Sequence, residues 1–171
     1  MKLSALQRFD VSVRQSIPVA LTLLLTVFSV VPVGLPAAST LAPDIVLIAV
    51  FYWTVHRPDL MRLWTVFVIG LLGDVLSGTP LGVHPIVLVL VHTAIISQHK
   101  VFRGASFGMV WWAFSLIAPA AHIAAVIIAF LATGALTDLS LFMLRLVLTI
   151  GFYPALAWLL GRAQRALLAS V

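Results

Sequence analysis

Six long apolar segments, separated by short polar connections, make up most of the chain. About 20 helical residues cross the apolar core of a bilayer, and about 17 can suffice. Lipid tolerates no unpaired backbone, and the segments lack the alternation of a barrel strand, so the pattern predicts helices. The predicted fold is all-α and integral to the membrane, with six transmembrane helices in one compact bundle. The predicted spans are 17–35, 41–56, 63–79, 83–98, 107–132 and 140–161.

Composition supports lipid as the solvent. Of the 171 residues, 63% are hydrophobic and 9% are charged, whereas a soluble domain carries roughly 25% charged residues. The length leaves no room for a separate soluble domain. We expect a basic cytoplasmic leader over 1–16, a membrane domain over 17–161 and a short basic cytoplasmic tail over 162–171.

The basic residues predict the orientation. All but one of the ten Lys and Arg residues fall before the first span, in the second or fourth connection, or after the last span. The positive-inside rule makes that side cytoplasmic, with both chain ends inside. This pattern is typical of membrane topology and does not indicate nucleic-acid binding. Tryptophan prefers the headgroup level, and we expect five tryptophans near the cytoplasmic ends of their spans: Trp53, Trp64, Trp111, Trp112 and Trp158.

The N-terminal region has two alternative interpretations. Basic residues followed by an apolar run and Pro36-Ala37-Ala38-Ser39 resemble a signal peptide, although the run of about 19 residues exceeds the usual 7–15. The leader itself is either a short interfacial helix, with Leu3, Leu6 and Phe9 among basic residues, or a disordered segment that only sets topology.

Three charged residues break the apolar pattern. Arg145 lies in the sixth predicted span, Asp74 in the third and Asp44 near the start of the second. Asp74 and Arg145 each lie about one turn, some 5–8 Å, below the predicted periplasmic surface. Charges within a bilayer usually face the bundle interior and pair. We therefore predict a buried polar cluster in which Arg145 pairs with Asp74 or with Asp44, either holding helices together or binding a ligand or partner.

Two other sets of residues, one of histidines and one of small residues, have either a structural role or a role in binding. His84, His92 and His122 lack the i, i+4 spacing of a helical metal site, so interhelical hydrogen bonds are favoured over a metal. Small residues recur on one face of the third predicted helix and allow close backbone approach. This face packs either on another helix of the chain or on a partner, and its candidates are Gly70, Gly73, Ser77, Gly78, Pro80, Leu81 and Gly82.

Motifs for catalysis are missing. The chain has no cysteine and no glutamate, which removes thiol nucleophiles and zinc–thiolate sites. Gly70-Leu71-Leu72-Gly73-Asp74 differs from the Gly-x-Gly-Asp of intramembrane aspartyl proteases, and no Walker phosphate loop is present. We predict no enzyme activity and no cofactor. Pro119 inside the long fifth span predicts a kink.

The stretch from Pro43 to Gly82 resembles the MreD family of bacterial rod shape-determining proteins. The matching residues are Ala42-Pro43-Asp44, Leu47, Tyr52-Trp53, Arg57-Pro58, Gly70-Leu71-Leu72-x-Asp74 and Ser77-Gly78-Thr79-Pro80-Leu81-Gly82. His99-Lys100-Val101-Phe102-Arg103 also looks like the basic connection of the family.

The resemblance implies a non-catalytic scaffold in the elongation complex, or elongasome, of the bacterial inner membrane. Expected partners are the bitopic protein MreC, actin-like MreB, a RodA-type glycosyltransferase and its penicillin-binding transpeptidase. The fold is expected to look like the substrate-binding component of energy-coupling-factor vitamin transporters, so capture of a small vitamin-like solute is the alternative function. MreC would meet the periplasmic level of Asp44, Asp74 and Gly78–Gly82. MreB or anionic lipid would meet the cytoplasmic basic residues Arg57, Arg62, Lys100 and Arg103.

Overall fold

The computed structural model describes residues 18–29, 42–134 and 138–168, and every regular element there is a helix. This confirms the all-α prediction. The predicted leader, residues 1–16, lies outside the described residues. The helices are Pro18–Ser29, α3 (Ile45–His56), α4 (Leu63–Ser77), α5 (Val83–Ser97), α6 (His99–Phe102), α7 (Phe107–Thr133) and α8 (Leu139–Leu168).

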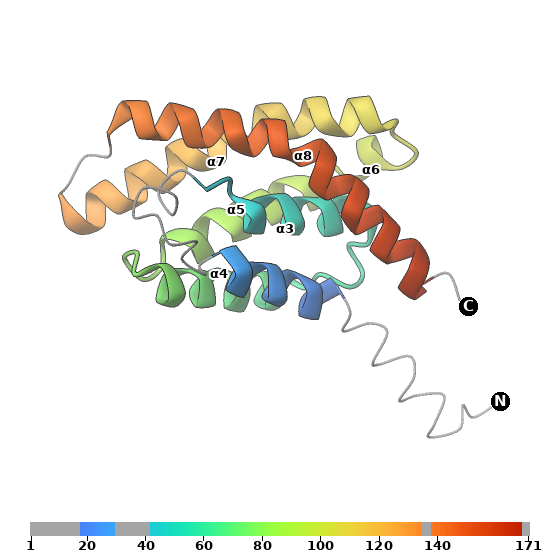
Figure 1. Cartoon of the computed structure of the whole chain (residues 1–171), viewed down its shortest axis with the longest axis horizontal. Coiled ribbons are helices and arrows are strands. Elements are labelled where there is room, and N and C mark those ends of the chain that lie inside the picture. The colour runs from blue at the N-terminus through green and yellow to red at the C-terminus, as the bar shows by residue number, and fades with distance from the viewer. Residues whose placement is uncertain (1–17, 30–41, 135–137, 169–171) are drawn as a thin grey trace, which may run out of the picture.

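The helices form a bundle in which successive long elements run in opposite directions. Figure 1 shows the connections α3–α4 and α5–α7 at one end, together with the end of α8. The α4–α5 turn and the start of α8 lie at the opposite end. The first of these ends carries the exposed side chains of Arg62, Lys100, Arg103 and Arg165, and we call it the basic end. The short connections explain the arrangement, because they leave neighbouring helices antiparallel.

The centre of the bundle is α3. Ten of its twelve residues, from Val46 to Val55, are buried. A helix that is apolar all round is expected to be surrounded by other elements. Here α3 packs against α5 and α8, with fewer contacts to α4. The sequence Ile-Val-Leu-Ile-Ala-Val-Phe-Tyr-Trp thus forms the core of the molecule.

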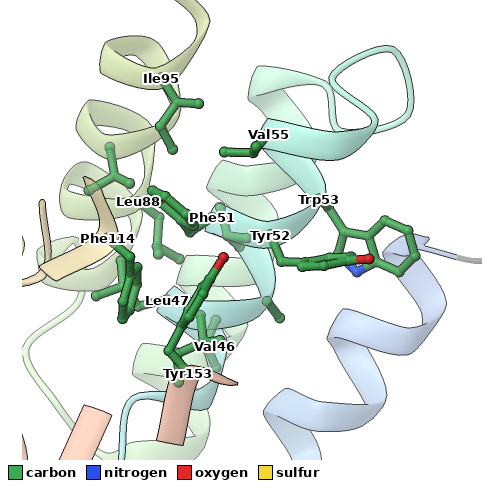
Figure 2. Packing of buried hydrophobic residues seen from close by; sticks show 14 of the residues in the cluster. Val46, Leu47, Phe51, Tyr52, Trp53, Val55, Leu88, Ile95, Phe114 and Tyr153 are labelled. Carbon is green, nitrogen blue, oxygen red and sulfur yellow. The ribbon is translucent and has the colours of Figure 1, made fainter. Parts of the chain in front are cut away.

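An aromatic cluster joins α3 to the two long helices (Figure 2). The ring of Phe51 meets Phe114 of α7 edge-on at 5.0 Å and Tyr153 of α8 at 5.8 Å. Phe114 and Tyr153 stack on each other at 4.5 Å. Such geometries are favourable beyond simple burial, which matters in lipid because apolar contact alone does not drive helices together.

Polarity is distributed inside out relative to a soluble protein. Buried polar side chains include Thr54, Asp74 and His92, whereas Trp112, Leu131 and Val147 are among many large apolar side chains that are exposed. Two helices are long and apolar enough to cross a membrane, Phe107–Thr133 and Leu139–Ala166, and four further apolar helices are shorter. An exposed apolar surface of this kind is what lipid requires.

Several details differ from the sequence prediction. Trp53 lies in the last turn of α3, but its side chain is fully buried in the core and does not face outward; its level in a membrane stays a prediction. Trp64, Trp112 and Trp158 are exposed. The last helix continues to Leu168, through most of the segment expected to be a tail. Figure 1 shows α7 and α8 bent partway along, and each contains an internal proline, Pro119 and Pro154.

Candidate functional site

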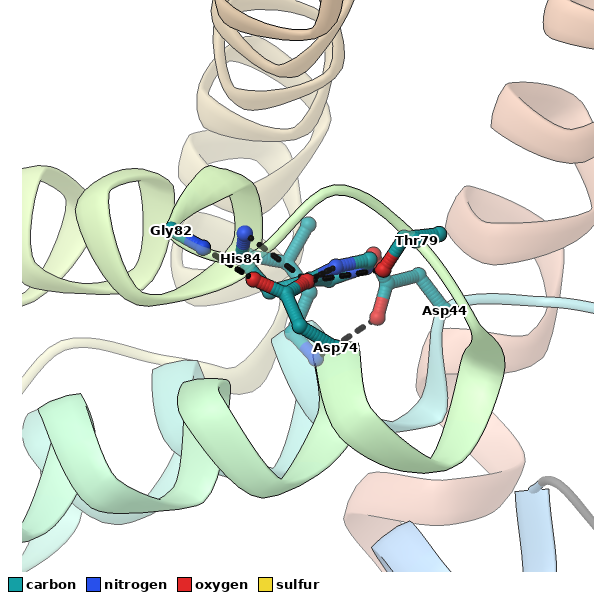
Figure 3. Close-up of polar contacts among 6 residues, drawn as sticks. Asp44, Asp74, Thr79, Gly82 and His84 are labelled. Carbon is teal, nitrogen blue, oxygen red and sulfur yellow. Dashed lines mark hydrogen bonds and ion pairs between the residues drawn. The ribbon is translucent and has the colours of Figure 1, made fainter. Parts of the chain in front are cut away.

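Asp74 organises the turn between α4 and α5. Its carboxylate is fully buried and accepts four hydrogen bonds from that turn (Figure 3). Oδ1 accepts from the Thr79 hydroxyl at 2.8 Å and from the His84 backbone N–H at 3.3 Å, and Oδ2 accepts from the Gly82 N–H at 2.7 Å. His84 Nδ1 lies 2.5 Å from Oδ1. A carboxylate only accepts, so Nδ1 carries the proton.

The local backbone explains why this turn needs these residues. Gly78 ends α4 and Gly82 precedes α5, both in the left-handed region, with φ of +66° and +105°. Only glycine adopts such values without strain. The reversal brings the first N–H groups of α5 onto Asp74, one turn before the end of α4. A helix start offers unpaired donors and the positive end of the dipole, so a buried carboxylate is well placed there.

The predicted pairing of Asp74 with Arg145 is not formed. Within the described part of the chain, the only titratable side chain that contacts the Asp74 carboxylate is that of His84, and its other bonds come from Thr79 and from the backbone N–H groups of Gly82 and His84. The sequence analysis did not predict the hydrogen bond between His84 and Asp74. The sequence did contain a signal for this arrangement. An acidic residue near the end of one helix is followed, across a short turn, by Thr79, Gly82 and His84, which can donate hydrogen bonds to it. The prediction erred because it paired charges by depth and ignored the nearer backbone donors.

Asp44 has a different task at the start of α3. Its Oδ1 accepts from the Leu47 N–H at 3.0 Å, which is an N-cap. Its own N–H donates to the Thr149 hydroxyl of α8 at 3.0 Å, and that hydroxyl donates to the Arg145 carbonyl at 2.7 Å. Asp44 also feels the charge of Arg145, but no ion pair within 4.0 Å joins the two residues. The alternative pairing is therefore a longer-range attraction.

A cavity of about 450 Å³ opens beside these residues, and we call it the polar cavity. It lies at the end of the bundle opposite the basic end. The start of α3, the end of α4, the starts of α5 and α8 and the middle of α7 line it. Its polar lining residues are Ser29, Asp44, Ser77, Thr79, His84, His122 and Arg145. Two of the three predicted cluster residues, Asp44 and Arg145, thus line one cavity. Asp74 does not line it but bonds to Thr79 and His84, which do.

The predicted small-residue face has a part buried within the bundle, at Gly70 and Gly73, and an exposed part that begins at Ser77. A Cβ on Gly70 would lie 2.6 Å from Pro85 Cα of α5, so this glycine permits a close helix contact within the chain. At Gly73 the nearest atom would be Thr26 Cγ2, 3.9 Å away on the Pro18–Ser29 helix. Ser77, Gly78 and Leu81 are exposed, and Pro80 is half-buried.

At the basic end, a second cavity of about 490 Å³ lies among α3, α7 and α8. Tyr52 and Arg165 line it, and the Tyr52 hydroxyl donates to Gln164 Oε1 at 3.0 Å. Arg57 makes an exposed two-bond ion pair with Asp59 at 3.2 and 3.3 Å, so its charge is already partnered. Pro58 lies between them, half-buried. Pro43, at the other end of α3, lines the polar cavity.

The histidines behave in three different ways. His92 Nδ1 donates to the Thr54 hydroxyl at 3.0 Å, an interhelical bond, because that hydroxyl itself donates to the Val50 carbonyl. His84 bonds across the turn. The third, His122, bonds within its own helix, to the Ala118 carbonyl at 2.9 Å, and its other ring nitrogen has no partner among the residues that the structure describes, so the interhelical prediction was wrong for it. Across the described ranges, no three His or Asp side chains gather as metal ligands would.

Comparison with known proteins gives one family. The model of the family described as rod shape-determining protein MreD matches residues 10–163 of the chain. Neither the curated proteins nor the solved structures contain a match. The predicted likeness to the vitamin-transporter component therefore stays a prediction.

Proposed function

We propose, from the fact that this chain belongs to the MreD family of rod shape-determining proteins, that it is a non-catalytic membrane scaffold of the cell-elongation complex. In this role it links MreC and MreB to the RodA-type glycosyltransferase and the transpeptidase in the inner membrane. The family match over most of the chain carries the proposal. Six passes through the membrane, with both chain ends in the cytoplasm, belong to the same proposal.

The distribution of polar groups supports a scaffold. The helices expose apolar side chains and bury their polar ones, and connections such as Gly78–Gly82 and 57–62 are short. Such a molecule has two kinds of contact surface, its lipid-facing helices and its few connections. Partners with transmembrane segments suit the first kind, and MreC and RodA have such segments by the family resemblance.

We place the MreC contact at the α4–α5 turn. Leu81 at the tip of this turn is 70% exposed, and the four hydrogen bonds to Asp74 hold the turn in one shape. A fixed backbone presenting an apolar side chain loses little entropy on binding. The turn also contains the run Ser77-Gly78-Thr79-Pro80-Leu81-Gly82, which carries the family resemblance.

Co-purification of MreC from native membranes tests this contact. Leu81→Asp is expected to reduce MreC recovery about tenfold, the effect of losing one well-buried interface anchor. Leu139→Asp is the matched control, because Leu139 is 68% exposed and starts α8 at the same end of the bundle. Equal recovery of MreC with both variants, at equal membrane levels, would refute this placement.

The cytoplasmic contact is assigned to the basic end. Arg62, Lys100 and Arg103 are exposed there and carry no ion pair within the described residues. Basic residues at a cytoplasmic surface attract anionic lipid by about 1 kcal/mol each. We propose that they bind anionic lipid, MreB or both. Arg57 contributes less, since Asp59 is its partner.

The alternative function, capture of a small vitamin-like solute for a transporter, has one observation in its favour, the polar cavity. The neighbouring genes discriminate the two functions. Genes for MreB and MreC beside this one support elongation, whereas genes for a pair of ATPases support transport.

A further inference from the structure

The polar cavity contains polar atoms that the protein itself leaves unpaired. Within the described chain, two buried side-chain nitrogens at this cavity have no hydrogen-bond partner: Nε of Arg145 and Nε2 of His122. His122 is only 8% exposed. Buried polar groups without a partner are rare in folded proteins, because each one has lost its hydrogen bonds to water without replacing them. Their presence around a space of about 450 Å³ points to a ligand, as cavities of roughly 300–1,000 Å³ hold small molecules.

The proton positions define what each group offers. The Nδ1 of His122 must donate to the Ala118 carbonyl, so in the neutral ring Nε2 carries a lone pair and accepts. Asp44 uses Oδ1 for the Leu47 N–H, which leaves Oδ2 as a further acceptor. Arg145 only donates and is positively charged. Among the lining residues, Arg145, His122 and Asp44 therefore offer one cationic donor and two acceptors, one of which is anionic.

The arrangement of charge disfavours a simple anion. Asp44 and Arg145 both line the cavity, yet no ion pair within 4.0 Å joins them. A ligand carrying only negative charge would gain from Arg145 and lose against Asp44. A ligand with both signs satisfies both residues, and its ammonium can also reach the His122 acceptor.

The rest of the lining shows where an apolar part of the ligand would lie. One side of α7 contributes Ala121, Ala125 and Ala129, together with Val126. The alanines repeat every four residues, and small side chains leave room beside the helix. Apart from His122, the α7 side of the cavity is therefore apolar, and Arg145 and Asp44 face it from α8 and from the start of α3.

We propose that the polar cavity binds a zwitterion, a molecule in which a phosphate or similar anionic group is joined to a primary ammonium. Arg145 binds the anionic group, and Asp44 and His122 bind the ammonium. A phospholipid headgroup and a free soluble molecule both have this chemistry. The inference requires neither the scaffold role nor transport.

Two probes distinguish the sources. Purified full-length protein is reconstituted in nanodiscs of phosphatidylcholine, whose quaternary ammonium has no N–H to donate. Phosphatidylethanolamine is then included in the disc, or soluble phosphoethanolamine is added, and thermal unfolding is followed. Binding to the folded state raises the unfolding temperature with probe concentration. Stabilisation by the lipid alone identifies a headgroup site, and stabilisation by the soluble probe identifies a solute site.

Variants test the assigned residues. Arg145→Gln and Asp44→Asn are each expected to weaken binding about tenfold or more, as expected for losing a charge-assisted bond. Asn still caps α3, and Arg145→Lys keeps the charge and is expected to restore part of the affinity. Arg165→Gln is the matched control, because it removes an arginine of the same helix at the other end of the bundle. The proposal is overturned if neither probe stabilises the wild type, or if the control weakens binding as much as Arg145→Gln.

Discussion

The contact between α4 and α5 at Gly70 gives a sharp test of how this bundle is held together. In Gly70→Ala the new Cβ would lie 2.6 Å from Pro85 Cα and 2.7 Å from Pro85 N. Both are backbone atoms, so no side-chain rotation relieves the clash and the helices must separate. Overpacking of this kind destabilises by about 1–3 kcal/mol, and the value here belongs at the upper end.

Helix propensity acts in the opposite direction. Replacing a helical glycine by alanine stabilises by up to about 1 kcal/mol, which leaves a net loss of about 1–2 kcal/mol for Gly70→Ala. Gly73→Ala is the internal control, because its Cβ would meet only Thr26 Cγ2, at 3.9 Å. That variant is expected to gain about 0.5–1 kcal/mol. The two substitutions are chemically identical and three residues apart.

The measurement is unfolding of the purified protein by sodium dodecyl sulfate in mixed micelles, followed by tryptophan fluorescence. We expect the midpoints of the two variants to move in opposite directions from the wild type. If Gly70→Ala is as stable as Gly73→Ala, the close approach of α4 to α5 does not contribute to stability, and the geometric argument fails.

Three further predictions concern the connections. Asp74→Asn keeps the size of the side chain, but its amide N–H then faces a hydrogen-bond donor of the α4–α5 turn. The free energy of unfolding should therefore fall by about 1–3 kcal/mol in the same assay. An unchanged midpoint would contradict the view that the Asp74 hydrogen bonds stabilise the turn. Gly82→Ala forces a side chain to φ of +105° and should lose about 1–2 kcal/mol, whereas Gly73→Ala, at an ordinary helical φ, should not lose stability. The Ser140 hydroxyl and backbone N–H both donate to Asp138 and hold its pKa below the ordinary value of 3.8. The stability from this cap is therefore present above the unfolded pKa and is lost as the pH falls through the lower folded pKa; Ser140→Ala should raise that pKa in an NMR titration, and no rise would refute the assignment.

The helices were predictable because their signal is local. Runs of apolar residues long enough for lipid located every described helix except the short α6, and Gly78 and Gly82 marked the turn between α4 and α5. The boundaries moved by a few residues because caps set helix ends: Asp44 starts α3 at Ile45, whereas hydropathy alone began the span at 41.

The partners of the polar residues were less predictable. Depth in the membrane is a one-dimensional coordinate, and it cannot tell which side chains share a face. Asp74 and Arg145 were expected to meet because their predicted depths are similar, but the N–H groups and the imidazole that follow the turn bond to Asp74 instead. Trp53 likewise followed the depth rule while its side chain pointed inward. The sequence also could not show that His122 Nδ1 bonds to a carbonyl of its own helix, α7, which leaves the other ring nitrogen without a partner among the described residues.

The length of α3 has an electrical consequence. This central helix has twelve residues, about 18 Å at 1.5 Å per residue, against about 30 Å for the hydrocarbon core. One cavity lies at its first turn and the other near its last. In the proposed six-pass arrangement, with water in both cavities, the insulating layer through the middle of the protein would be little more than half as thick as the surrounding bilayer. A transmembrane voltage would then fall more steeply along α3 than through lipid, with Asp44 and Arg145 at the edge of that steep region.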